Sequence, residues 1–166
     1  MSAGGWPAIG TVVGETSTAE FTFVLQSYKS RVGDIVAVPM EVPTDDYAGT
    51  REIIAWGRIT SIERYNPFFP YEAAQELTEE NIRLVDTVLS ATRDQLEAKA
   101  TVLGFTGARD EQELDLYPLT YPIPPAAQVR YPPADAVRRL LSGGLRGQTP
   151  LCIGTLIARA DVQVAI

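Results

Sequence analysis

The sequence predicts a mainly β protein, a small closed antiparallel β-barrel with an inserted helical lobe and a short helix on its C-terminal side. Two observations predict this fold class. Short segments of β-branched residues, or of apolar residues alternating with polar ones, recur along the chain. Clusters of Gly, Asp, Ser and Thr separate them, as turns separate antiparallel strands. Short, evenly spaced strands are typical of a small barrel. We expect residues 1–166 to form one domain, because a chain of this length with 45% apolar residues can bury a core.

The first three strands are expected at residues 9–14, 20–25 and 35–39. In the second of these, Phe21 and Phe23 fall on one face and Thr22 falls on the other, which is the pattern of a half-buried strand. Turn clusters at 14–18 and 33–34 separate the three segments.

A longer strand is expected at residues 51–64, after a polar loop at 41–50 that contains Pro43 and Gly49. Gly57 interrupts this strand near its middle. A glycine inside a strand indicates a bulge or strong coiling, both of which a small barrel needs.

An inserted lobe is expected at about residues 65–95. Residues 65–71 are too rich in aromatic residues and proline to form a regular strand. Thr78 is a suitable N-cap for a helix at 79–94, and Glu79 and Glu80 in its first turn favour the positive end of the helix dipole.

Strand character resumes at residues 96–105 and is followed by an acidic loop at 107–115. Four prolines in residues 116–125 exclude a central strand and predict an extended segment that crosses the barrel. A short strand is expected at 128–131.

A two-turn helix is expected at residues 134–141. Pro132 and Pro133 precede it, and Gly143 and Gly144 can cap its end. Two further strands are expected at 150–158 and 162–166, and we expect residues 151–166 to close the barrel.

Charge and composition limit the partners of this chain. The net charge is −7, so we expect the chain alone to bind nucleic-acid phosphates poorly, although a folded surface could still gather basic residues in a local patch. The N-terminus does not read as a signal peptide, and no apolar run approaches the roughly 20 residues that span a membrane. We expect a soluble, cytoplasmic protein without a membrane partner. Cys152 is the one cysteine, and we expect it to be buried as a small apolar side chain.

The sequence lacks the residues of the common catalytic and cofactor sites. It contains no histidine, which removes the commonest general base and any histidine-based metal site. Glycine-rich nucleotide loops and nucleophile elbows are also missing. We therefore do not predict an enzyme from these residues, and we expect no catalytic, cofactor or metal site in this chain.

Two clusters are candidates for binding a partner. Phe68, Phe69 and Tyr71 could form an exposed docking patch, or they could plug one end of the barrel or pack the inserted helix. Arg138 and Arg139 could contact a phosphate or an acidic neighbour, or they could form a solvated helix face.

Four early segments together resemble the HAS barrel, the domain shared by HerA-type hexameric DNA translocases and ATP synthase subunits. They are residues 9–14, 20–23, 32–36 and 57–62. The later part of the chain is similar to the HerA branch in the order of its segments: 99–104, a proline-rich crossing with Val129, a helix at 134–141, 151–156 and 161–164.

The resemblance implies a non-catalytic N-terminal module of a HerA-like ATP-dependent DNA translocase or helicase that acts in DNA end resection and double-strand break repair. It implies a collar on a homo-hexamer that helps neighbouring subunits assemble and docks the NurA nuclease. It also implies that an ATPase domain with ATP and Mg²⁺ follows beyond residue 166, and that DNA is met by the whole assembly. No catalytic motif of the family has matching positions in this chain.

One alternative remains open at this point. The chain could be a free-standing OB-like barrel that binds single-stranded nucleic acid with its aromatic side chains.

Overall fold

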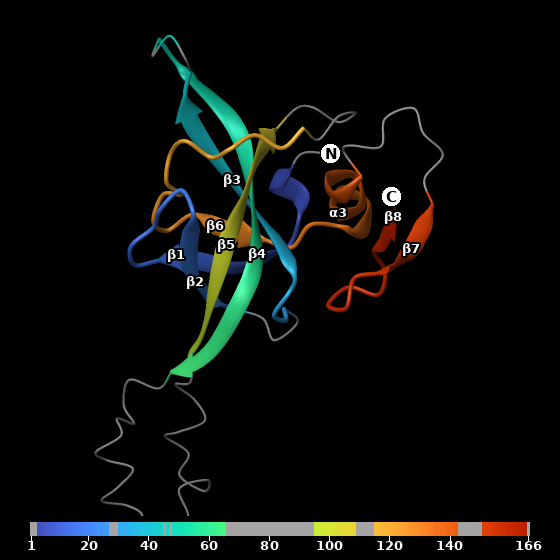
Figure 1. Cartoon of the computed structure of the whole chain (residues 1–166). Coiled ribbons are helices and arrows are strands. Elements are labelled where there is room, and N and C mark those ends of the chain that lie inside the picture. Colours follow the sequence, from blue (N-terminus) through green and yellow to red (C-terminus); the bar gives the residue numbers. More distant parts are fainter. Residues whose placement is uncertain are drawn as a thin grey trace, which may run out of the picture.

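A computed structural model of the chain confirms the predicted fold class: its described residues contain a closed, six-stranded antiparallel β-barrel and one α-helix on the C-terminal side of the barrel (Figure 1). The structure describes residues 3–26, 30–44, 46, 48–65, 95–108, 115–142 and 151–165. The inserted lobe, with the helix expected at 79–94, lies outside the described residues, as do the acidic stretch 109–114 and Gly143–Gly144.

Six strands form the barrel in the order β1-β2-β5-β4-β3-β6. Their bounds are β1 Ala8–Val13, β2 Glu20–Leu25, β3 Ile35–Pro43, β4 Thr50–Tyr65, β5 Gln95–Gly107 and β6 Gln128–Arg130. Strands β4 and β5 are the longest and run side by side through the middle of the molecule (Figure 1).

The short strand β6 closes the barrel. Its Arg130 is opposite Ala8 of β1 and also opposite Ala37 of β3. The Arg130 guanidinium donates hydrogen bonds to the carbonyls of Gly4 and Trp6 at 2.9 and 2.6 Å, which hold β6 against the N-terminal segment. The expectation that residues 151–166 close the barrel is therefore wrong. Because β6 already lies between β1 and β3, those strands have no free edge for the later segment.

Strand β4 coils at the predicted position. The register of β4 against β5 shifts between Trp56 and Gly57, which confirms the bulge. A Cβ atom at Gly57 would lie 2.8 Å from the ring of Phe21 on β2, so any side chain at this position would force that buried ring to shift. Strand β3 runs to Pro43, further than residue 39 as predicted, because Met40 and Val42 also turn into the barrel core.

The barrel interior holds the larger apolar core. Phe21 and Phe23 of β2 are fully buried there, with ring centroids 5.8 Å apart. Ile53 and Ile59 of β4 and Val129 of β6 pack into the same cluster. The aromatic face predicted for residues 20–25 is thus the inward face.

A second core covers the outer surface of β3 and β4. It is formed by the 3₁₀ helix η1 (Ala3–Gly5), helix α3 (Ala134–Leu141) and Val162 next to β8 (Gln163–Ala165), all packed on Ile35, Ala37, Ile54 and Trp56. The rings of Trp6 and Trp56 lie 5.7 Å apart, and Trp56 Nε1 donates to Thr106 Oγ1 at 2.9 Å. Residues 35–38 of β3 and 53–56 of β4 are therefore buried on both faces of the sheet.

Strand β7 (Cys152–Thr155) pairs with β8 in a separate two-stranded sheet. In Figure 1 this hairpin lies with α3 on the right of the barrel. Residues 116–125 form the predicted extended crossing segment, fixed by backbone hydrogen bonds of 2.8 and 2.9 Å between Phe105 and Tyr117.

Candidate docking surfaces

The two arginines predicted as a partner site lie on the exposed side of α3. Ala136, Val137 and Leu140 bury the other side of this helix. Arg138 forms an ion pair with Asp135 at 2.9 Å, and Arg139 Nε donates to the carbonyl of Asp135 at 3.3 Å. Both guanidinium groups thus bond within their own helix. Phe68, Phe69 and Tyr71 lie outside the described residues, so the structure does not bring the two predicted clusters together.

A buried arginine fastens the hairpin to the barrel side. Arg159 is 6% exposed and donates to both carboxylate oxygens of Asp161, at 3.0 and 2.7 Å, and to the carbonyl of Pro132 at 2.9 Å. Its guanidinium carbon also lies 4.4 Å from the ring centroid of Tyr131, a cation–π contact. The hydrogen bonds to Asp161 raise the pKa of Arg159 and lower that of Asp161, so both groups are held in their charged forms.

Asp34 is the buried acid near this arginine. Its Oδ2 accepts a hydrogen bond from the backbone N–H of Arg31 at 2.8 Å. Its Oδ1 and the hydroxyl of Ser30 are buried without a hydrogen-bond partner in the described part of the chain. Burial raises the pKa of Asp34, although the N–H of Arg31 and the charge of Arg159 oppose the rise. Burial therefore destabilises the charged form of the Asp34 carboxyl.

The hairpin carries an unusual amount of exposed apolar surface. Val32, Leu151, Ile153 and Ile157 are all more than half exposed, and we call these four residues the hairpin patch. Val32 belongs with them because the neighbouring Gly33 lies against Ala158: a Cβ atom built on Gly33 would be 3.6 Å from that of Ala158. Every residue of β7 is exposed. The prediction that Cys152 is buried is wrong, because β7 pairs with β8 in the separate two-stranded sheet and does not belong to the barrel wall.

A second apolar surface lies where the crossing segment passes over β5. Leu103, Leu116, Tyr117 and Tyr121 are each between 38% and 54% exposed, and we call them the crossing patch. A Cβ atom on Gly104 would lie 2.8 Å from the side chain of Leu116, so the absence of a side chain there lets the crossing segment lie directly on the strand. The left-handed φ of +143° at Gly104 also favours glycine.

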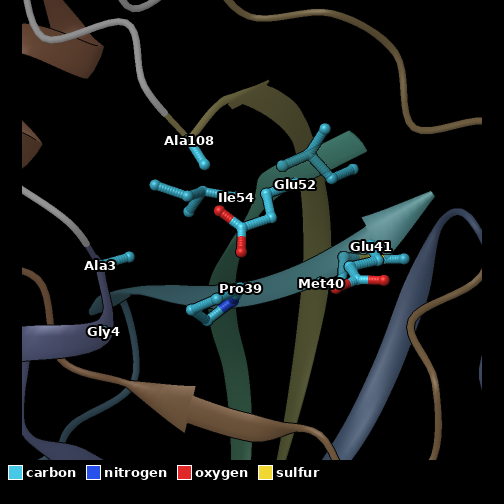
Figure 2. Close-up of a pocket in the computed structure, with 9 residues that line it drawn as sticks. Ala3, Gly4, Pro39, Met40, Glu41, Glu52, Ile54 and Ala108 are labelled. Carbon is cyan, nitrogen blue, oxygen red and sulfur yellow. The ribbon is translucent and has the colours of Figure 1, made fainter. Parts of the chain in front are cut away.

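An acidic pocket of about 280 Å³ opens on the outer face of β3 and β4. It is lined by Ala3, Gly4, Pro39, Met40, Glu41, Glu52, Ile53, Ile54 and Ala108. Figure 2 shows the carboxylate of Glu52 pointing into it, toward Pro39, while Glu41 lies to one side along β3. Glu41 and Glu52 are directly opposite in the β3–β4 ladder. Like charges in this position repel each other, so the pocket favours a cation over an anion.

In the part of the chain that the structure describes, no group of three or more Asp, Glu or Cys side chains is arranged to hold a metal ion. Within the same residues, no helix is long and apolar enough to cross a membrane. No family model and no curated protein matches this chain.

Sequence reasoning missed the anchor of the hairpin and both exposed patches. The sequence did carry signals for them. Arg159 is the one charge in residues 147–160, an otherwise uncharged stretch, which is the pattern of a paired buried cation. Residues 116–129 and 147–158 contain no charged residue, which is consistent with surfaces that contact protein.

Proposed function

We propose that this chain is a non-catalytic module of a HerA-like, cytoplasmic, ATP-dependent DNA translocase that acts in DNA end resection and break repair. In this role it assembles neighbouring subunits and docks a NurA-type nuclease. The observation that carries the proposal is the order of the parts along the chain. A six-stranded barrel ends at Arg130, α3 follows at once, and a separate hairpin comes last. This order agrees with the order of segments in the resemblance to the HerA branch.

The surface chemistry supports a docking role over direct DNA binding. Exposed apolar side chains gather in the hairpin patch and the crossing patch, as expected of surfaces that contact protein. The net charge of −7 opposes contact with a phosphate backbone. Contact with DNA is therefore assigned to the complete translocase.

The test is isothermal titration calorimetry, which measures binding of the purified chain to the NurA-type nuclease encoded in the same genome. We expect saturable binding that weakens in the Phe68→Ala/Phe69→Ala variant. The Arg138→Glu/Arg139→Glu variant tests the second predicted cluster in the same way. Thr18→Lys, a change at an exposed turn residue, is the control. Absence of any heat of binding with the wild-type chain would contradict the proposed function.

The same preparation separates this function from the OB-like alternative. A fluorescent single-stranded oligonucleotide is titrated with the chain at two salt concentrations. The docking module is expected to bind it only weakly, because no net positive charge draws in the phosphates. Tight, salt-sensitive binding would favour the nucleic-acid reading instead.

A further inference from the structure

The hairpin patch and the crossing patch are chemically alike and lie on different sides of the molecule. Figure 1 shows β7 and β8 on the right of the barrel, while the crossing segment runs from the end of β5 to its left. Three of the four residues of each patch lie in an uncharged stretch, residues 151–158 and 116–129, in a chain with 14 basic and 21 acidic residues. Two copies of a chain with net charge −7 repel each other, so a contact through uncharged segments adds no further pair of like charges.

The exposed areas are large enough to matter. Fully burying an aliphatic side chain removes on the order of 100 Å² of apolar surface from water, so the hairpin patch exposes about 300 Å². With about 200 Å² for a tyrosine, the crossing patch exposes a similar area. Together they give about 600 Å², close to the apolar part of an interface of about 1,200 Å², the lower end for specific complexes.

We propose that the hairpin patch of one copy packs against the crossing patch of the next copy. A contact between two hairpin patches would leave both crossing patches in water, whereas this head-to-tail contact covers both patches of each copy with one kind of interface. Repetition of a head-to-tail contact closes into a ring when the rotation between copies allows it. The inference rests on the proposed function, which supplies the assembly of neighbouring subunits. The new element is the pair of surfaces that meet.

Complementation between two variants tests the pairing. The hairpin variant carries Ile153→Lys and Ile157→Lys, and the crossing variant carries Leu116→Lys and Tyr121→Lys. The four target side chains are at least 39% exposed, so these changes should spare the fold, and an unchanged melting temperature checks this. Each added lysine also lowers the net negative charge, so a loss of association cannot come from stronger overall repulsion. Thr18→Lys is the matched control.

Sedimentation velocity gives the readout. We expect the wild-type chain and the Thr18→Lys control to associate, and each double variant to sediment as a monomer. An equimolar mixture of the two variants should recover one 1:1 dimer, because each partner still offers one intact patch. A wild-type chain that stays monomeric at every concentration would overturn the inference. Association that survives in either variant, or a mixture that stays monomeric, would do the same.

These outcomes are separate from those of the nuclease titration. The chain can bind the nuclease while its self-association fails, which would leave the proposed docking function standing and remove only the head-to-tail contact. Self-association without nuclease binding would contradict the docking function and leave the head-to-tail contact standing.

Discussion

Arg159 is a charged residue in a buried position, where apolar side chains are usual. Three hydrogen bonds and the face of Tyr131 surround its guanidinium, while its partner Asp161 stays 57% exposed. Removing the arginine leaves the carbonyl of Pro132 without this donor and empties the space between the hairpin and the barrel side.

We expect Arg159→Met to lower the free energy of unfolding by about 2–4 kcal/mol, the range for breaking a buried charged network. Arg138→Ala is the control. It removes an exposed ion pair within α3 and should cost at most about 0.5 kcal/mol. Urea unfolding of both variants checks this, and equal losses would contradict the anchoring role of Arg159.

Asp34 predicts a pH dependence of stability. Its pKa in the folded chain is raised above 3.8, so the folded chain holds this proton more tightly than the unfolded chain does. The stability that protonation contributes is complete below pH 3.8 and is lost as the pH rises through the raised pKa. Asp34→Asn has no proton to lose there. We therefore expect the stability of the variant relative to wild type to increase with pH above 3.8 and then to level off.

Urea unfolding of both chains at a series of pH values from about 4 to about 7 measures this difference. The lowered pKa of Asp161 acts in the opposite direction, but it is present in both chains and largely cancels. A difference that is constant, or that shrinks with rising pH, would contradict the assignment.

At the scale of the element, β4 depends on a residue with no side chain. Gly57 lies where β4 passes the ring of Phe21, and β7 contains a glycine of its own, Gly154, with open space around it. The same glycine-to-alanine substitution can therefore be compared at a crowded position, Gly57, and at an open one, Gly154.

We expect Gly57→Ala to destabilise the chain by about 1–3 kcal/mol, because the added methyl group overpacks the barrel core. Gly154→Ala should change the free energy of unfolding by less than about 1 kcal/mol, or should stabilise slightly, because alanine has less freedom in the unfolded chain. Thermal and urea unfolding compare the two. A larger loss at Gly154 would mean that the coiling of β4 does not depend on this contact.

At the scale of the whole molecule, β3 and β4 belong to two cores at once. Both tryptophans, Trp6 and Trp56, lie in the outer core, whereas most of the β-structure belongs to the barrel. We expect tryptophan fluorescence and far-UV circular dichroism to report one shared urea transition, because the outer core cannot separate from strands that form the barrel wall. An earlier fluorescence transition would show that the two cores unfold separately.

Local patterns predicted the strands well, but they predicted the barrel closure wrongly. The strand at residues 20–25 and the bulge at Gly57 depend on local sequence. The alternation of apolar residues and the position of the glycine were therefore sufficient to predict them. Strand β6 closes the barrel, but it has only three residues. So short a segment has little pattern, and the longer apolar stretch at 150–158 was predicted to close the barrel instead. The runs at 35–38 and 53–56 are apolar at every position, which is the mark of strands covered on both faces.

The exposed patches were harder to predict than the fold. Apolar residues are usually buried, yet Leu151 and Ile153 are exposed, and no local pattern separates a strand buried in a barrel from one at the surface. Asp34 looked like an ordinary turn residue. Its pKa responds to the charge of Arg159, a residue that is distant along the sequence.

The exposed thiol on β7 makes the hairpin chemically addressable. Cys152 is the one cysteine of the chain, so a maleimide dye will attach once, at a known place, without further engineering. The rate of that alkylation then measures how freely solvent reaches the hairpin. We expect the rate to fall when a second copy covers the hairpin and to stay unchanged when a ligand binds on the far side of the barrel.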